Sequence, residues 1–398
     1  MAPETVTTTS PHPTPLRRAL PPATLVRLAV AWGVVAVFLF LGSTWLAAPI
    51  STVTAVVCFA ILFATILYAA FGVVREADHL AHMLGEPYGT FILTLSIVAI
   101  EVILIAAVMM GPGEAATIAR DAIFAVMMII LNLVTGLCLL FGGLRHGEQE
   151  YNSQGAVAYL SMIVLLTGTA LALPNTLSTG DGSLRPVQAL GLAVITALLY
   201  AAFLTLQMRG YRRFFVQPHQ GKLSVPLPSQ RHTAAENSPE AAGPPLDKTT
   251  VAARSFILLA LLLPIVILAQ DMAILIDLGV AQAGAPVAVG GLIIATIVFT
   301  PESITAVRAA LANQMQRALN LCLGAFVSTV GLTVPVVLLI GLVTQQTVTL
   351  GLNPLDMLLL ILTVLLSILS FLGLRTSPVQ GVMHLTLFVI YAFLLFVP

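Results

Sequence analysis

Long apolar runs constrain this chain more than any other feature of its sequence. Several of them exceed the roughly 20 residues that an α-helix needs to cross a hydrocarbon core about 30 Å thick. With 58% hydrophobic residues, 9% charged residues and a mean hydropathy of +1.01, the chain lacks the polar residues that would cover a soluble globule. The period-2 alternation of a transmembrane β-barrel is absent. We therefore predict an all-α integral membrane protein whose main partner is the lipid bilayer.

Hydropathy predicts about eleven transmembrane helices, with one helix standing apart from ten that follow it. The expected spans are residues 26–46, 50–74, 88–110, 121–144, 155–173, 187–207, 252–276, 284–307, 318–343, 354–373 and 378–397.

The polar segments divide the chain further. Residues 1–25 are rich in Pro and Thr, and we expect them to form a disordered cytoplasmic tail rather than a signal peptide, because no small-residue cleavage site follows closely. The predicted organisation is a tail (1–25), an extra first helix (26–46), a first five-helix repeat (50–207), a cytoplasmic linker (208–251) and a second five-helix repeat (252–397).

The positions of Lys and Arg predict the orientation. If the N-terminus is cytoplasmic, all of the 17 Lys and Arg residues except Arg120 and Arg185 fall in cytoplasmic segments. Positive residues favour the cytoplasmic side of a membrane protein. We therefore expect a multi-pass protein of the bacterial inner (plasma) membrane, with a cytoplasmic N-terminus and a periplasmic C-terminus.

Two glutamates occupy matching places in the two repeats. Glu101 and Glu302 each follow a long run without charged residues, and Gly89 and Gly290 each lie twelve residues ahead of their glutamate. Because five helices bring the chain to the opposite face, the second repeat should run inverted relative to the first. A pseudo-two-fold axis in the membrane plane would then bring the two carboxylates together near the midplane.

A carboxylate inside a membrane helix is costly and marks a functional candidate. Two such groups close together in a low dielectric cannot both stay ionised without a cation, so the pair should bind either protons or a metal ion. Hard cations such as Ca²⁺ take six to eight oxygen ligands, and further oxygens are therefore needed. The possible additional ligands in the neighbouring sequence are Thr94, Ser96, Asn132, Thr300, Ser303, Ser328 and Thr329. For each hydroxyl, a hydrogen bond to its own helix is the competing interpretation.

Other polar residues in the apolar runs have weaker interpretations. Pro301 directly precedes Glu302, and we expect it to break the helix locally and expose carbonyl groups. Asp271 is a possible proton relay or a structural acid, and His79 and His82 are possible pH sensors or solvated residues. The three cysteines lie in apolar runs and are interpreted as small core residues.

The sequence disfavours several other classes of function. Lys and Arg together equal Asp and Glu in number, so net charge does not distinguish between classes of partner, and no nucleic-acid partner is expected. The chain has no HExxH motif and no glycine-rich phosphate loop, which argues against a metalloprotease and an ATP-driven pump. No cofactor is expected, and the chain is not expected to be an enzyme. A membrane sensor that does not transport is the alternative from another functional class.

Three segments carry a family resemblance: LGEPYGTFILTLSIVAIEV (84–102), LFGGLRHGEQEYN (140–152) and PESITAVRAALANQMQRALNLCLGAFVSTVGLTVP (301–335). The sequence here resembles the Ca²⁺:cation antiporter superfamily, and most closely its bacterial calcium/proton antiporter branch. The resemblance implies alternating access and proton-driven Ca²⁺ efflux, with Glu101 and Glu302 at the acidic cation-binding positions.

The sequence departs from that family pattern next to both glutamates. Eukaryotic vacuolar relatives carry an asparagine-containing GNA-E sequence there, whereas Ala99-Ile100 and Thr300-Pro301 precede the glutamates in this chain. The resemblance implies Ca²⁺/H⁺ exchange, which we expect first, and the loss of the asparagine ligands keeps Na⁺/H⁺ or K⁺/H⁺ exchange through the same site as the alternative.

Overall fold

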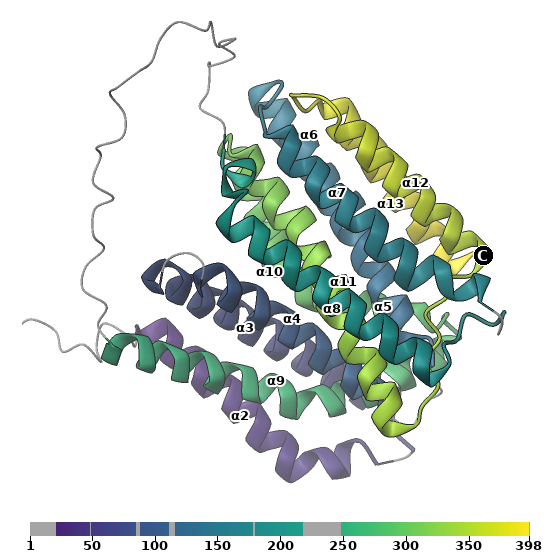
Figure 1. Ribbon diagram of the computed structural model, residues 1–398. Helices are drawn as coiled ribbons and strands as arrows, with labels where there is room; N and C mark the ends of the chain where they lie inside the picture. Colours follow the sequence, from purple (N-terminus) through teal and green to yellow (C-terminus); the bar gives the residue numbers. More distant parts are fainter. Residues whose placement is uncertain are drawn as a thin grey trace, which may run out of the picture.

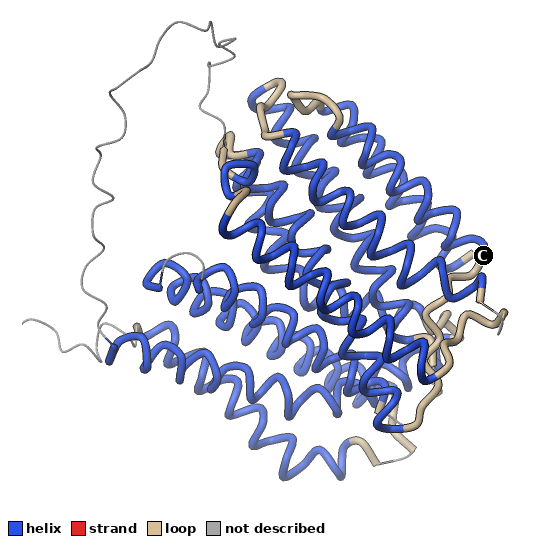
Figure 2. Tube along the Cα trace, in the orientation of Figure 1, coloured by secondary structure: helices blue, strands red, loops and turns tan. Residues whose placement is uncertain are grey.

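The computed structural model describes residues 21–47, 49–84, 88–110, 116–177, 180–217 and 248–397. These residues form helices and connecting loops, with no β-strand among them beyond two isolated bridges (Figure 2). In chain order the helical passes are α2 (Pro22–Trp45), α3 (Thr52–Leu84), α4 (Tyr88–Met109), α5 (Ile118–Met127) continuing through η1 (Met128–Val134) into α6 (Thr135–His146), and α7 (Ser153–Thr167) continuing through η2 (Gly168–Ala172) into η3 (Leu173–Thr176). They continue with α8 (Pro186–Arg209), the short η4 (Arg212–Phe215), α9 (Lys248–Ala283), α10 (Ala288–Leu311), α11 (Met315–Thr344), α12 (Pro354–Phe371) and α13 (Pro378–Phe396).

The predicted set of eleven passes is confirmed. Among the described residues, ten of these passes are long and apolar enough to cross a membrane, and α4 contributes the shorter apolar stretch Leu95–Met109. The helix ends differ from the hydropathy edges. Helix α3 continues to Leu84, about ten residues past its predicted end, and α9 already begins at Lys248. Hydropathy stops where polar residues begin, but a helix can continue through them. In the extension of α3, Glu76 pairs with Arg254 of α9. Most of the predicted tail and linker lies outside the described residues.

Helices α3 and α9, the first helix of each predicted repeat, pack side by side (Figure 1). Glu76 near the end of α3 forms an ion pair with Arg254 near the start of α9, with 2.8 Å between Oε2 and Nη1. The two helices therefore run in opposite directions, as an inverted pair of repeats requires. Helix α2 packs on both of them, and Thr24 of α2 donates a hydrogen bond to Oε1 of the same Glu76.

Helix α10 carries Glu302 and is anchored by a close approach to α5. A Cβ atom on Gly291 would lie only 2.7 Å from the backbone nitrogen of Ala122. Small residues allow membrane helices to approach closely in this way. Contrary to the sequence expectation, α10 is not broken at Pro301 and continues to Leu311. A proline is tolerated inside a membrane helix. On either side of Pro301, hydroxyl groups of Thr300, Ser303 and Thr305 donate to carbonyls of the same helix.

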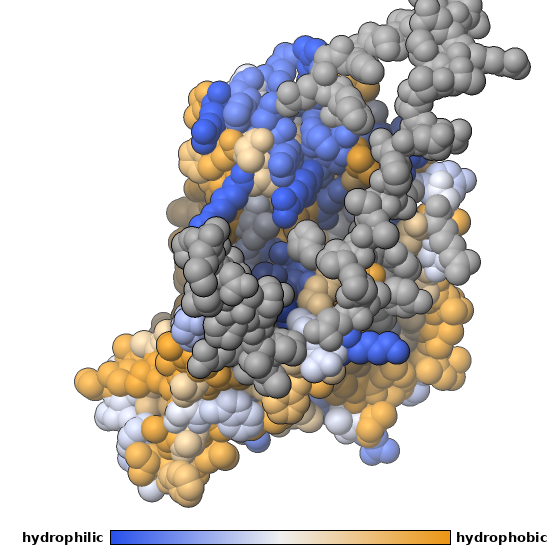
Figure 3. Space-filling view, turned by 90° about the vertical axis from the view of Figure 1, so that its left-hand side faces the viewer, coloured by the Kyte–Doolittle hydropathy of each residue, from blue (hydrophilic) through white to orange (hydrophobic). Residues whose placement is uncertain are grey.

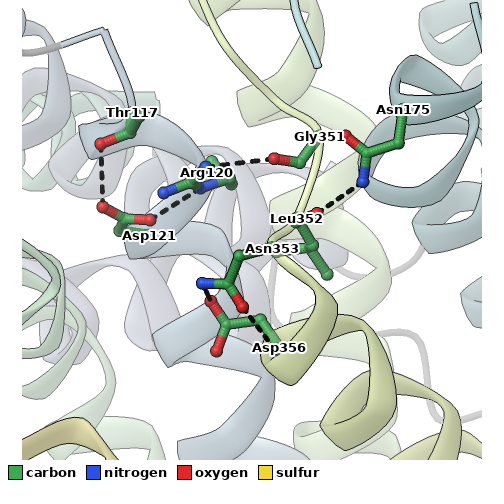
Figure 4. Close-up of polar contacts among 8 residues, drawn as sticks. All are labelled: Thr117, Arg120, Asp121, Asn175, Gly351, Leu352, Asn353 and Asp356. Carbon is green, nitrogen blue, oxygen red and sulfur yellow. Dashed lines mark hydrogen bonds and ion pairs between the residues drawn. The ribbon is translucent and has the colours of Figure 1, made fainter. Parts of the chain in front are cut away.

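The end of the bundle opposite the Glu76–Arg254 pair is closed by the loop between α11 and α12 (Figure 4). Arg120 at the start of α5 pairs with Asp121 at 2.8 Å and also donates to the carbonyl of Gly351 at 3.1 Å. Asn353 and Asp356 hydrogen bond to one another where the loop enters α12. Backbone bonds from the loop to Leu171 and Gly182 add further ties. This end of the described bundle is thus held together by side-chain and backbone contacts.

Candidate cation-binding site

A cavity of about 1080 Å³ extends into the bundle from the end where α3 ends and α9 begins. Its outer part is lined by charged residues of α3, α10 and α11, and its inner part by Glu302, Ser328 and Thr329. Figure 3 views this end of the molecule, where hydrophilic residues gather around a hollow. The cavity therefore connects one face of the bundle with the region of the two predicted glutamates.

Glu101 lies on α4 and is completely buried. Its Oε2 atom accepts a hydrogen bond of 2.9 Å from Thr329 Oγ1 on α11, while its Oε1 atom has no hydrogen-bond partner among the described residues. Because Thr329 also lines the cavity, Glu101 lies one side chain behind the cavity wall.

Glu302 lies on α10, where it faces the same cavity. Thr329, the hydrogen-bond partner of Glu101, lines the same cavity as Glu302. Its buried Oε2 atom also lacks a hydrogen-bond partner in the described part of the chain. A smaller cavity of about 10 Å³ lies between Glu302 and the helix segments at Ile130 and Val134. The structure thus brings together the two acids that the sequence places about 200 residues apart.

Thr333 is a further polar residue at this place that the sequence analysis missed. It lies on α11 one helical turn beyond Thr329, the hydrogen-bond partner of Glu101, and is buried. Its Oγ1 atom has no hydrogen-bond partner among the described residues. Buried polar atoms are nearly always hydrogen bonded, so an unpartnered group requires an explanation. The two carboxylates and this hydroxyl together offer oxygen atoms to a cation.

Most of the other predicted ligand hydroxyls point toward their own helices. Ser96, Ser303 and Ser328 donate to backbone carbonyls three or four residues earlier, at 2.7, 2.6 and 2.7 Å. Thr300 does the same toward Thr296. The side chain of Thr94 lies outside the described part of the structure. Among the predicted hydroxyls, Thr329 is the one that contacts a glutamate in the described residues.

Asn132 belongs to a separate buried network. Its Nδ2 atom donates to Thr363 Oγ1 at 2.9 Å, and its Oδ1 atom is paired with His384 Nδ1 at 3.2 Å. The Nε2 atom of His384 in turn forms a hydrogen bond with Ser370 Oγ at 3.1 Å. Asn132 lies in the π-helical segment η1, where the wider turn changes the direction of successive side chains. The prediction of Asn132 as a ligand of the glutamate site is therefore not supported by its contacts, which tie η1 to α12 and α13.

The remaining predicted residues lie away from the glutamates. Asp271 on α9 faces Gly42 of α2. His79 is partly buried beside Glu76 and Arg254, and the side chain of His82 is not described. Roles of Asp271 as a relay and of the histidines as pH sensors stay predictions. The cysteines Cys58, Cys138 and Cys322 are free and buried, which agrees with their interpretation as core residues.

A family model described as sodium/calcium exchanger protein matches residues 54–209 and 253–397. The chain belongs to this family. Each matched segment contains one of the two glutamates. The family resemblance inferred from the sequence motifs is confirmed.

Two proteins are similar to this chain over most of their length. The chain is 33% identical over 336 residues to the putative ionic transporter y4hA of Sinorhizobium fredii. This alignment covers 83% of this chain and 86% of the relative. It is 34% identical over 331 residues to the sodium-potassium/proton antiporter ChaA of Escherichia coli, with the same shares covered. The Ca²⁺/H⁺ antiporter ChaA of Bacillus subtilis is 23% identical over 211 residues, covering 52% of this chain and 55% of that relative.

Solved structures of exchangers share the fold. The structure of native YfkE covers 94% of this chain and 100% of its own chain, with a TM-score of 0.69 and 18% identity. The crystal structure of the H⁺/Ca²⁺ exchanger CAX covers 93% of this chain and 87% of its own, with a TM-score of 0.66 and 14% identity. The exchanger fold thus holds for this chain. The chain is an antiporter-family membrane protein with multiple spans, and the family is one of secondary transporters rather than enzymes.

Replacing Thr329 with valine is expected to raise the half-saturating cation concentration about tenfold, since a hydrogen bond to a charged group contributes about 1.5–3 kcal/mol. The change removes the one described hydrogen bond of the Glu101 carboxylate. Cation-dependent proton flux in reconstituted vesicles measures the effect. Ser96→Ala is the matched control, because its hydroxyl donates to Ile92 of its own helix. An unchanged half-saturating concentration in Thr329→Val would count against a role for this hydroxyl.

Proposed function

We propose that this chain is a secondary cation/proton antiporter in which Glu101 and Glu302 bind the transported cation and protons in turn. The proposal rests on one observation: two carboxylates, each with an oxygen that lacks a hydrogen-bond partner among the described residues, lie at the inner end of a cavity that reaches one face of the bundle, with Glu302 in its wall and Glu101 behind Thr329. In such surroundings the pair is stable when protonated or when a cation neutralises it.

Competition for the same oxygens supplies the coupling. A cation that enters through the cavity reaches Glu302 first and Glu101 through Thr329. Protons that bind to these carboxylates remove the charge that holds the cation, so the two cannot be bound together. Alternating access then requires that the cavity close and the opposite end open, where Arg120 and the loop around Gly351 now join the helices.

Na⁺ or K⁺ is the substrate that we propose first. Ca²⁺ takes six to eight oxygen ligands, whereas Thr329 is the one described hydroxyl that is hydrogen bonded to a carboxylate of the pair. Ser303 and Ser328 line the cavities beside Glu302, but both donate to carbonyls of their own helices. The relative with 34% identity is named a sodium-potassium/proton antiporter. This reverses the order of the sequence expectation, which placed Ca²⁺ first.

Ca²⁺/H⁺ exchange is the second candidate. It is favoured by the pairing of two carboxylates, whose combined charge would match one divalent ion, and by the partial similarity to a Ca²⁺/H⁺ antiporter. For either substrate, we propose the bacterial inner membrane as the location, with the cavity and the N-terminus on the cytoplasmic side.

Reconstitution into liposomes with an imposed pH gradient tests the proposal. Addition of NaCl or KCl is expected to release the gradient, as reported by a trapped pH-sensitive dye, and choline chloride should leave it intact. A response to CaCl₂ alone would support the second candidate. If none of the three cations moves protons, the antiporter proposal is wrong and a sensor that does not transport becomes the better interpretation.

A further inference from the structure

The outer part of the cavity carries an excess of positive charge. The basic residues that line it come from four different helices, so they surround the mouth rather than follow one helix face. Among the described residues, six charged ones line the cavity: Arg27 of α2, Arg75 and Asp78 of α3, Glu302 and Arg308 of α10, and Arg317 of α11. Four of them are arginines, and Glu302 lies at the inner end.

These arginines are not neutralised by partners. Arg75, Arg308 and Arg317 are exposed, and none of them forms an ion pair with a residue that the structure describes. Arg317 donates a hydrogen bond to the uncharged side chain of Gln314 at 3.4 Å. Arg27 stacks over the ring of Tyr68, with 5.3 Å from its guanidinium carbon to the ring centroid. Their positive charge therefore acts on the space in the cavity.

The neighbouring charges do not reverse this excess. Glu76 lies close by but is bound to Arg254, so the two charges cancel. Arg213 in η4 is exposed at the same end and adds positive charge, although its guanidinium lies over Phe214. Asp78 is therefore the one acid that faces the outer part of the cavity among the described lining residues.

A positive potential in a cavity acts on ions in proportion to their valence. Low-dielectric walls focus the field of charged side chains and change the local concentration of mobile ions. If the potential lowers the local concentration of a monovalent cation by some factor, it lowers that of a divalent cation by the square of that factor, because the electrostatic energy doubles. Rings of charged side chains act on ions in channels by the same principle.

We propose that the arginine rim, defined as Arg75, Arg308 and Arg317, is a valence filter that disfavours divalent cations relative to Na⁺ and K⁺ at the mouth of the cavity. This inference rests on the proposed antiport function and names the part of the chain that sets its substrate class. The filter acts on cations before they reach Glu302, and the glutamate pair then binds what enters.

The double variant Arg308→Gln/Arg317→Gln tests the filter. Na⁺-dependent proton flux is measured in everted vesicles, with Ca²⁺ added either as the substrate or as a competitor. Removal of two charges is expected to lower the half-saturating Na⁺ concentration about threefold and the concentration at which Ca²⁺ has half its effect about ninefold. The squared relation between the two changes is the signature of the filter.

Three controls separate the filter from other effects. Arg308→Lys/Arg317→Lys keeps the charges and should behave like the unchanged protein. Arg185→Gln removes an exposed arginine outside the cavity lining, and should change neither concentration. An impermeant salt at 0.5 M should remove most of the difference between the double variant and the unchanged protein, since the Debye length falls to about 4 Å.

The inference and the proposed function fail in different ways. If the unchanged protein shows no cation-dependent proton flux, the proposed function is wrong. If the unchanged protein shows normal flux, but the double variant changes the half-saturating Na⁺ and the half-effective Ca²⁺ concentration by the same factor, or changes neither, the valence filter is wrong. The antiport proposal then still stands. A Ca²⁺ effect that is absent in both proteins also overturns the filter, because discrimination must then lie at the glutamates.

Discussion

Replacing either Glu101 or Glu302 with glutamine is expected to lower cation-dependent proton flux at least about a hundredfold, since loss of a charged contact of about 3 kcal/mol is sufficient for that change. Glutamine keeps the shape of the side chain but neither binds a proton at neutral pH nor carries a negative charge. The transported cation and the proton would therefore both lose a binding group. Flux in reconstituted vesicles measures the effect, with Na⁺, K⁺ and Ca²⁺ tested separately.

The two glutamine variants should remain folded, because the change removes a buried charge and adds no volume. Size-exclusion profiles and thermal unfolding in detergent check this. Glu148→Gln is the control, since Glu148 is exposed and contacts only Arg375 at 3.5 Å among the described residues. Normal flux in either Glu101→Gln or Glu302→Gln would exclude that carboxylate from the binding site.

The second large effect is expected on stability. Arg254→Met should lower the free energy of unfolding by about 3–5 kcal/mol, because it leaves the carboxylate of Glu76 buried without its partner. Glu76 is 1% exposed, and its Oε2 atom lies 2.8 Å from Arg254 Nη1. The remaining hydrogen bond from Thr24, at 3.3 Å, is long and comes from a neutral donor. Unfolding in mixed micelles with increasing denaturing detergent measures the loss.

A double variant separates loss of the pair from loss of packing. Glu76→Gln/Arg254→Met removes both charges, and replacing a complete buried pair with neutral groups is often close to neutral in stability. It should therefore recover most of the stability that Arg254→Met loses, and the cycle of variants gives the coupling between the residues. If the double variant is as unstable as Arg254→Met, the effect comes from the packing of α3 on α9 rather than from the unpaired charge.

The fold of the bundle follows from the sequence to a large extent, because apolar runs and the Lys and Arg pattern act over the whole length of each helix. Helix ends are less predictable. Helix α3 continues past the apolar run because Glu76 finds Arg254 on α9, a residue far away in the chain. The expected break at Pro301 is wrong, since α10 is continuous from Ala288 to Leu311. A proline inside a membrane helix removes one backbone hydrogen bond without ending the helix.

The sequence by itself determined that the chain crosses the membrane repeatedly and that Glu101 and Glu302 occupy matching places, since hydrophobicity and spacing are local properties that no folding is needed to observe. Only the tertiary structure decided which oxygens accompany them. Whether a hydroxyl donates to its own helix or to a neighbouring one depends on how the helices pack. Thr329 therefore donates to Glu101, whereas Ser96 and Ser303 donate to backbone carbonyls of their own helices. The cavity and its arginine rim are likewise products of packing, because they join residues of helices far apart in the chain.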